Sequence, residues 1–430
     1  MGGMALKLLF RYGKGCLPVN IGDKNVVRLV ENKMMETVQP AAEVERALNN
    51  PIGSLSLGAV IQEKRPQQLA VVVTDISRPV PYQEVLPSLM QQIHSAGLEK
   101  DRITFVIATG AHRPNTLDEN REVFGQFTEN YTFINHDCDK GLVSLGFLKD
   151  GTELLMNRRV AEAEMVLTIG AVMPHNLAGF SGGPKLIFPG VAGRKTIESN
   201  HRMMKAPGVG PGKISGNPIQ KQIWEGTERV GVDFALNLVL NQENQILKAF
   251  AGSLKSSWEE GCFFCQEAYR CNLPDPEQVV IAGAGGYPRD LNLYQSVKAL
   301  TNAARLTKPG GTIVLVAKCQ DGMGDPMFEQ WMSGVKEPEE VLGRFKNQGF
   351  TLGPHKAFML CELFKNKEVI LISDLDRPDT RVPLLKTFNR WEHAERELVK
   401  KHGSNYRAII LPLAGLVFPL TGQLHPAGIV

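Results

Sequence analysis

Short apolar runs alternate along the chain with segments that have the hydrophobic periodicity of helices. The runs are rich in β-branched residues, as buried strands are, and lie at residues 7–12, 68–74, 103–108, 165–170, 234–240, 279–282, 312–317 and 369–373. Amphipathic segments fall between many of them, at residues 82–95, 258–269, 293–306, 335–345 and 391–401. Strands that alternate with helices predict an α/β fold with largely parallel sheets.

A chain of 430 residues is longer than one hydrophobic core usually serves, so we expect two domains. The clearest boundary is Asn272-Leu-Pro-Asp-Pro276, where two prolines follow a helix and precede a new strand. We therefore predict an N-terminal α/β domain over residues 1–272 and a C-terminal α/β domain over residues 277–411. The tail, residues 412–430, no longer alternates, and this leaves open a return onto the first domain.

Composition and charge exclude several classes of protein. Hydrophobic residues make up 43% of the chain and charged residues 22%, which is ordinary for a globular protein. The net charge of +3 is too small to indicate binding to nucleic acid or to a membrane surface. The chain has no apolar stretch of about 18 residues and no signal-peptide pattern, so we expect a cytoplasmic protein.

The seven cysteines are scattered, which does not fit a disulfide framework. Cys262 and Cys265 form a CxxC pair with Cys271 nearby, but no second such pair accompanies them. Buried thiols are therefore favoured over a metal or redox site.

Two apolar strands end in loops that carry charged side chains. Asp75 and Arg78 follow the first strand, and His112 follows the second. Asp75 could simply cap the next helix and pair with Arg78. Alternatively, the Arg78 guanidinium suits a substrate carboxylate, and a histidine on a neighbouring strand-end loop is a candidate acid–base group.

Residues 170–193 are too rich in glycine and proline to form a regular helix or strand. Ser181, Gly182 and Gly183 could present backbone N–H groups as a nest for a phosphate. Lys185 follows among apolar residues, where a lowered pKa would make its amine a nucleophile. The alternative is a lysine whose charged end simply reaches solvent from an apolar patch.

A fourth stretch begins at residue 280 and resembles a dinucleotide-binding loop. Pro288 and Asp290 stand where the third glycine and the helix start should be, which argues against that interpretation. Downstream, Tyr294 and Lys298 share one face of a predicted helix with Gln295 beside them. Either this face binds an anion or it is an ordinary solvated face. The remaining histidines have no comparable neighbours and are interpreted as structural or surface residues: His94, His136, His355, His393, His402 and His425.

Taken together, four stretches resemble the nickel-dependent lactate racemase family. They are TDISRPVP, ATGAHRP, PHNLAGFSGGPKLIFPGVAG followed by NH, and GGYPRDLNLYQSVKAL, and they span residues 74–300 in the family's order. The resemblance implies racemisation or epimerisation of a small, lactate-like 2-hydroxy acid. The implied cofactor is a nickel-pincer nucleotide, nickel pyridinium-3,5-bisthiocarboxylic acid mononucleotide, which holds Ni(II) and exchanges a hydride with the substrate through a 2-keto acid.

The resemblance also implies roles for individual residues. Lys185 matches the lysine that anchors the cofactor, and His201 matches the histidine that ligates nickel. The glycine nest at Ser181, Gly182 and Gly183 is our own inference for the seat of the cofactor phosphate. The acid–base histidines match His112 and His175, and Asp75 is expected to orient one of them, most naturally His175. Substrate would be bound by residues from both domains, so the site is expected in the cleft between them: Arg78, Tyr294, Gln295 and Lys298.

Two other functions remain open from the sequence. One is a nicotinamide-dependent 2-hydroxy acid dehydrogenase, and the other is a non-catalytic nickel or organic-acid binding protein. The resemblance implies cofactor-assembly enzymes and a small-molecule substrate as partners, and it leaves a homo-oligomer open.

Overall fold

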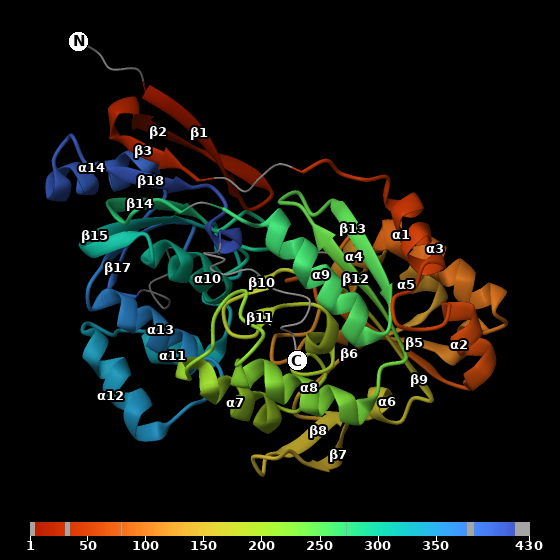
Figure 1. Cartoon of the computed structure of the whole chain (residues 1–430). Helices are drawn as coiled ribbons and strands as arrows, with labels where there is room; N and C mark the ends of the chain where they lie inside the picture. Colours follow the sequence, from red (N-terminus) through yellow and green to blue (C-terminus); the bar gives the residue numbers. More distant parts are fainter. Residues whose placement is uncertain (1–4, 31–34, 79, 272, 376–381, 418–430) are drawn as a thin grey trace. The chain divides into compact units, whose positions relative to one another are not determined.

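The computed structural model describes residues 5–30, 35–78, 80–271, 273–375 and 382–417. These residues form two compact units (Figure 1). The N-terminal unit runs from residue 35 to residue 268, and the C-terminal unit combines residues 5–30 with residues 269–417. Each unit has a six-stranded, mostly parallel sheet, which confirms the predicted α/β fold. No helix within the described ranges is long and apolar enough to cross a membrane.

Residues 5–30 belong to the C-terminal unit, which differs from the predicted division at residue 272. β3 (Val26–Leu29) pairs in parallel with β18 (Ala408–Leu411), and the hairpin of β1 (Ala5–Tyr12) and β2 (Gly15–Gly22) buries Phe10 in the same core. Alternating apolar residues predict a strand but not its sheet, because pairing partners can lie anywhere in the chain. In the predicted tail, residues 412–417 stay with the C-terminal unit and include η6 (Ala414–Leu416), while residues 418–430 lie outside the described residues.

The sheet of the N-terminal unit has a buried strand at its centre. Its order is β13 (Ile246–Gly252), β12 (Phe234–Leu240), β9 (Met165–Ala171), β4 (Leu69–Thr74), β5 (Ile103–Ala108) and β6 (Thr132–Asn135), and only β13 is antiparallel. One face packs on α1 (Pro40–Asn49), α2 (Leu57–Lys64), α3 (Tyr82–Ser95) and α4 (Leu117–Phe124). α9 (Leu254–Ala268) lies along β12 and β13 (Figure 1).

The order of these strands creates a reversal beside β4. From β4 the chain passes through β5 to β6 on one side, and it then returns to β9 and β12 on the other. Ligands of open α/β sheets bind where the strand order reverses, outside the carboxyl ends of the strands. The loops that follow β4, β5 and β9 are the ones that carry Asp75, His112 and Lys185. The topology therefore supports the sequence argument for chemistry at this edge.

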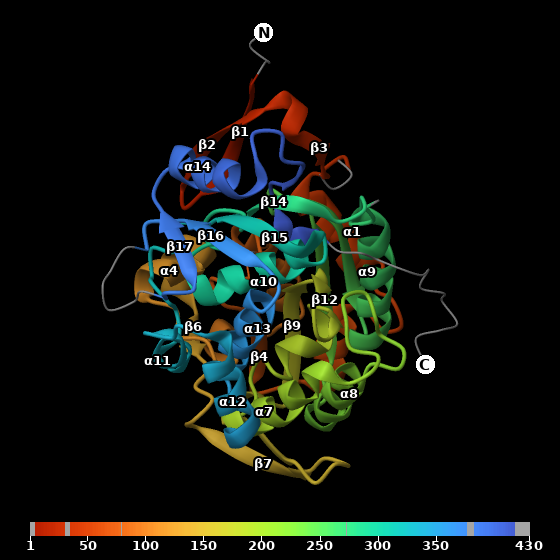
Figure 2. The same ribbon diagram turned by 90° about the vertical axis from the view of Figure 1, so that its left-hand side faces the viewer.

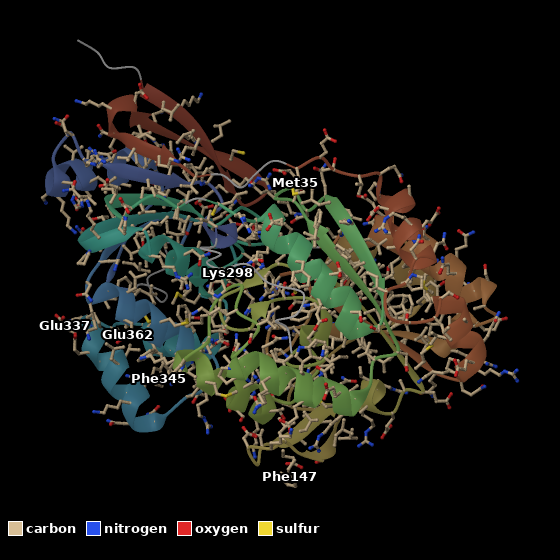
Figure 3. The ribbon with its side chains drawn as sticks, viewed as in Figure 1. Met35, Phe147, Lys298, Glu337, Phe345 and Glu362 are labelled. Carbon is tan, nitrogen blue, oxygen red and sulfur yellow. The ribbon has the colours of Figure 1, made fainter. Side chains whose placement is uncertain are left out.

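Shorter elements complete the N-terminal unit. They are α5 (Phe127–Asn130), the hairpin of β7 (Leu142–Phe147) and β8 (Glu153–Asn157), α6 (Arg158–Ala161), the small hairpin of β10 (Pro174–His175) and β11 (Gly179–Phe180), η3 (Gly183–Leu186), α7 (Arg194–Arg202) and α8 (Pro218–Val230). The β7–β8 hairpin ends near the exposed Phe147, which is labelled in Figure 3.

The sheet of the C-terminal unit has the order β17 (Leu385–Phe388), β16 (Glu368–Ile372), β15 (Thr307–Val316), β14 (Glu277–Gly283), β18 and β3, all parallel. One face packs on α10 (Leu293–Ala304), α11 (Pro326–Met332), α12 (Pro338–Gln348) and α13 (Pro354–Phe364). The other face packs on the β1–β2 hairpin and α14 (Trp391–His402), and Figure 2 shows α14 and α10 on opposite sides of the strands. This strand order also reverses beside β14, whose loop leads into α10.

Candidate active site

Asp75 and His112 form a close pair at the ends of two adjacent parallel strands. β4 and β5 run in register, with Thr74 opposite Ala108, so their loops begin level with each other. His112 Nδ1 lies 2.7 Å from Asp75 Oδ2. Asp75 is only 3% exposed, whereas the side chain of His112 is 29% exposed. A buried carboxylate thus holds one nitrogen of a histidine that still reaches the surface of the unit.

The electrostatics keep Asp75 ionised. Burial by itself raises the pKa of this carboxyl, but the charge and hydrogen bond of His112, together with Arg78, lower the pKa overall. A carboxylate accepts, so His112 donates from Nδ1, and the neutral ring carries its lone pair on Nε2. The expectation that Asp75 orients His175 was therefore wrong. Asp75 contacts His112, because β5 is the immediate neighbour of β4 in the sheet.

The loop from Asp75 to Arg78 is a tight turn in which the Arg78 N–H donates to the Asp75 carbonyl at 3.0 Å. Ser77 donates to Asp75 Oδ1 through both its hydroxyl, at 2.5 Å, and its backbone N–H, at 2.9 Å. The Arg78 side chain is exposed, and its Nη1 donates to the carbonyl and the hydroxyl oxygen of Ser77, both at 3.0 Å. The turn thus brings the Asp75 and Arg78 side chains together on the Ser77 hydroxyl, and their shared role in one site stays a prediction.

His175 is held in a different way. It ends β10, and its Nδ1 accepts the backbone N–H groups of Leu177 and Ala178, both at 3.2 Å. An accepting Nδ1 places the proton of the neutral ring on Nε2. His175 is half-buried, so its ring is not a core residue.

The structure does not support the predicted phosphate nest. The Ser181 N–H donates to the Met173 carbonyl at 2.7 Å, and the Gly183 N–H donates to Asn237 Oδ1 at 2.9 Å. The Ser181 hydroxyl is also engaged, since it donates to the Ala171 carbonyl at 2.8 Å. Two of the three N–H groups that would form the nest thus bond within the protein.

The two glycines of this segment are needed for close packing instead. Gly182 and Gly183 have φ angles of +70° and +46°, which favour glycine. A Cβ at Gly183 would collide with the Trp258 ring, and one at Gly182 would lie 2.9 Å from the Ala171 carbonyl oxygen. The segment therefore lies close against α9 and β9, and this close packing fixes the start of η3.

Lys185 lies on η3 between buried neighbours. Leu186 packs against Gly170 of β9, and Thr227 of α8 donates to the Pro184 carbonyl at 3.2 Å. Burial, assisted by the charge of Arg78, lowers the pKa of the Lys185 amine to about 7. No residue within the described ranges accepts a hydrogen bond from Nζ or forms an ion pair with it. This amine has the properties that the sequence predicted for a nucleophile.

His201 lies in the last turn of α7. Its Nδ1 donates to the Ile197 carbonyl at 3.1 Å, one turn earlier, which places the lone pair of the neutral ring on Nε2. Metal-bound histidines commonly donate their other N–H in this way. The neighbouring Asn200 is fully buried and ties α7 to α8 through the Ile219 carbonyl, at 3.1 Å, and Gln222. The described residues contain no group of three or more His, Cys, Asp or Glu that could hold a metal ion.

In the C-terminal unit, the predicted substrate-binding residues share one face of α10. Tyr294, Gln295 and Lys298 are half-buried, whereas the positions between them are buried, and Figure 3 labels Lys298 on this helix. Asn292 caps α10 by accepting the Gln295 N–H at 2.9 Å. The Tyr294 ring contacts Phe328 edge-on, with centroids 5.7 Å apart, and Lys356 Nζ lies 5.5 Å from its centroid. The predicted position of these residues opposite Lys185 in a cleft stays a prediction.

Two cysteines and one histidine that do not belong to the predicted site have structural roles. Cys262 and Cys265 are buried free thiols, in agreement with the interpretation from the sequence. His136 is also structural, because both of its ring nitrogens bond within the protein, to the Ala192 carbonyl and to Asn157.

Three residues that stabilise the candidate site were not identified from the sequence. Ser77 could have been found from its position two residues after Asp75, because an aspartate side chain often bonds the backbone two residues further on. Asn237 could have been found as a polar residue inside an apolar strand. Trp258, which donates to the Ser181 carbonyl at 2.9 Å, has no such signal.

Comparisons with known proteins agree with the geometry. Residues 12–211 match the lactate racemase N-terminal domain, and residues 274–413 match the lactate racemase C-terminal domain. The lactate racemase of Thermoanaerobacterium thermosaccharolyticum is 33% identical over 374 residues, covering 84% of this chain and 87% of that protein. The lactate racemase of Lactiplantibacillus plantarum is 31% identical over 420 residues, covering 93% and 96%.

Solved structures point the same way. The lactate racemase apoprotein from T. thermosaccharolyticum matches with a TM-score of 0.86 at 30% identity, over 96% of this chain and 99% of that one. A Thermotoga maritima protein of 17% identity has the same fold, with a TM-score of 0.69 over 89% and 99% of the two chains. The chain therefore belongs to the lactate racemase family.

Proposed function

We propose that this protein racemises lactate, or a closely similar 2-hydroxy acid, with a nickel-pincer nucleotide held by Lys185 and His201. Membership of the lactate racemase family makes the chain an isomerase of 2-hydroxy acids. We propose in addition the mechanism and the cofactor described below, cofactor-assembly enzymes as partners, and a cytoplasmic location.

The observation that carries the proposal is the opposite character of two histidines. Asp75 accepts from Nδ1 of His112, so the neutral His112 ring offers a lone pair at Nε2. Backbone amides donate to Nδ1 of His175, so the neutral His175 ring offers a proton at Nε2. A proton acceptor and a proton donor are the two groups that inversion of a hydroxyl-bearing carbon requires. A binding protein has no need of either arrangement.

Each remaining group has a task on the substrate. Arg78 binds the carboxylate through its planar guanidinium, which is exposed and aimed by the turn after β4. His112 takes the hydroxyl proton of one enantiomer, while Asp75 holds the ring and stabilises its charged form. His175 returns a proton to the substrate oxygen from the other side of the substrate. Tyr294, Gln295 and Lys298 complete the substrate contacts.

The residues present fit the proposed cofactor. An amine with a pKa of about 7 is partly unprotonated at neutral pH and is then a nucleophile, as Lys185 would need to be to hold the nucleotide through a covalent bond. His201 would ligate nickel through Nε2, because Nδ1 donates to Ile197. When bound, the group supplies a reversible hydride acceptor.

The test is co-expression with cofactor-assembly enzymes, followed by intact-mass measurement and a chiral assay of each lactate enantiomer. We expect a covalent mass increase, bound nickel and interconversion in both directions. Lys185→Ala should lose all three, whereas Lys195→Ala, an exposed lysine of α7, should keep them. A nicotinamide-dependent dehydrogenase would show no added mass and would need a nicotinamide. A mass increase that survives Lys185→Ala would refute the anchor.

A further inference from the structure

The Ser77 hydroxyl lies where three charged or ionisable side chains meet. Its Oγ is 2.5 Å from Asp75 Oδ1, 3.0 Å from Arg78 Nη1 and 3.3 Å from His112 Nδ1. A hydroxyl has one hydrogen and two lone pairs. The carboxylate can only accept, so the hydrogen goes to Asp75, and the lone pairs face Arg78 and His112. Because the His112 proton already goes to Asp75 at 2.7 Å, the main partner of the lone pairs is Arg78.

Arg78 is held by Ser77 twice. Its Nη1 donates to the hydroxyl oxygen and to the carbonyl oxygen of the same residue, both at 3.0 Å. The backbone beneath is also fixed, because Thr74 Oγ1 donates to the Arg78 carbonyl at 2.9 Å and the Ile76 N–H donates to Asn115 at 3.0 Å. A free arginine side chain samples many rotamers, and this entropy opposes any defined contact with a substrate.

We propose that Ser77 is a positioning residue that fixes the Arg78 guanidinium relative to the Asp75–His112 pair. The inference rests on the proposed function in one respect, since it takes Arg78 as the group that binds the substrate carboxylate. Ser77 itself touches no substrate in this arrangement. It links the group that binds the carboxylate to the group that removes the hydroxyl proton, so that both meet one substrate at a fixed separation.

The position of Arg78 also affects the pKa of Lys185. Arg78 is the charged group that acts on Lys185 besides burial itself. The elements packed on η3 contribute uncharged groups among the described contacts, namely Thr227 of α8, Trp258 of α9 and Asn237 of β12. Two cations repel, so a guanidinium released from Ser77 would move away from the amine. The pKa of Lys185 should then rise.

The decisive measurement uses the cofactor-free protein and needs no racemase activity. Trace labelling with acetic anhydride across pH, followed by peptide mass spectrometry, gives the midpoint at which the Lys185 amine becomes reactive. We expect a wild-type midpoint near pH 7. Arg78→Gln should move it upward, because the repulsion from the guanidinium is removed, and Ser77→Ala should move it the same way by a smaller amount. Ser77→Thr, which keeps the hydroxyl, should keep the wild-type midpoint. Ser54→Ala, at a half-buried serine whose hydroxyl donates to the Leu55 carbonyl at 2.9 Å, should leave it unchanged.

One result of this labelling experiment would contradict the proposed role of Ser77. If Arg78→Gln shifts the midpoint while Ser77→Ala and Ser77→Cys do not, Ser77 does not position Arg78. Ser77→Cys provides a second variant in case the alanine protein does not fold, since its sulfur is a weak hydrogen-bond acceptor.

Kinetics of the cofactor-loaded enzyme then separate this idea from the proposed function. Loss of one charge-assisted hydrogen bond on Arg78 should raise KM for lactate by about tenfold, with a smaller change in kcat. Equal loss of folded protein and activity, with KM unchanged, would indicate a merely structural serine. If no enzyme form racemises lactate, the proposed function fails, but the labelling midpoints still decide the role of Ser77.

Discussion

Replacing Asp75 by asparagine is the sharpest test of the site, because the structure leaves the amide no satisfactory orientation. One carboxylate oxygen accepts two hydrogen bonds from Ser77, and the other accepts the Nδ1 proton of His112. Asparagine has only one oxygen. If that oxygen faces Ser77, the NH₂ group faces His112 and drives its proton to Nε2, which removes the base. If it faces His112, the NH₂ group meets the Ser77 N–H, and a largely buried donor loses its partner.

Both orientations have a cost of known size. The wrong tautomer of a general base typically lowers the rate ~10²–10⁴-fold, which corresponds to about 3–5 kcal/mol in the activation free energy. A buried donor left without an acceptor costs about 1–3 kcal/mol of folding free energy. Asp75 is 3% exposed, so water cannot readily replace the missing acceptor. We therefore expect Asp75→Asn to fold, with reduced stability, and to racemise at least about a hundredfold more slowly.

The assay is racemisation of each pure enantiomer by the cofactor-loaded enzyme, together with ¹⁵N NMR of the His112 ring in the cofactor-free protein. NMR should report a loss of the Nδ1–H tautomer. Asp118→Asn is the matched control, because the Asp118 side chain is 91% exposed and forms a surface ion pair with Arg121. An Asp75→Asn protein that racemises within threefold of wild type would refute the reasoning. So would a change of tautomer at His175 without one at His112.

The other predictions concern Lys185 as the proposed cofactor anchor, His201 as the proposed nickel ligand, and the two histidines His112 and His175. Lys185→Met removes a poorly solvated cation and should stabilise the cofactor-free fold by about 1–2 kcal/mol, well below the full value of the pKa shift because the side chain is only partly buried. The pKa of Lys185 is lower in the folded state than in the unfolded state, so the stability of the wild-type protein rises from pH 7 towards pH 10.5. The extra stability of Lys185→Met over wild type should therefore vanish near pH 10.5. Thermal unfolding that shows the same extra stability at every pH would contradict this. His201→Ala should lose nickel, measured by metal analysis, while intact mass still shows the organic adduct, and full retention of nickel would exclude the ligand role. His112→Ala and His175→Ala should each slow racemisation in both directions by ~10²–10⁴-fold. In single-turnover absorbance they should differ in which enantiomer still reacts, and a near-wild-type rate for either would rule out two bases.

Much of the fold could be predicted from the sequence, because buried parallel strands have a strong local signature. The apolar run at residues 68–74 corresponds to β4, and the amphipathic segment at residues 82–95 corresponds to α3. Strand partners are not a local property. β3 is short and partly exposed, and its pairing with β18 joins residues that are almost the whole chain apart. The placement of residues 5–30 in the C-terminal unit therefore could not be predicted from periodicity.

The candidate site shows the same division between local chemistry and long-range geometry. The sequence singled out Asp75 and His112 as candidate site residues, because polar side chains at the ends of apolar strands are conspicuous, and the structure brings the two together. It assigned the wrong histidine to Asp75, because the choice depends on which strand is the neighbour of β4. The glycines after residue 180 were interpreted as an anion nest, but a φ above zero can serve either an anion or close packing. Only the contacts with Trp258 and Asn237 decide between these uses.

The use of these glycines for packing has a consequence for Lys185. A nucleophilic amine must lie in a poorly solvated environment, yet an unpaired cation there destabilises the fold. The segment before it lies close against the sheet and α9 because Gly182 and Gly183 have no side chains, and because Asn237 and Trp258 bond the backbone on either side. These contacts stabilise η3 in a position that the lysine alone would not favour. An anion nest at the same glycines would require the N–H groups to turn outward, and the start of η3 would lose its hydrogen bond to β12. The packing of this loop and the lowered pKa of Lys185 are therefore two consequences of one backbone conformation, and the phosphate of the proposed cofactor would need other donors.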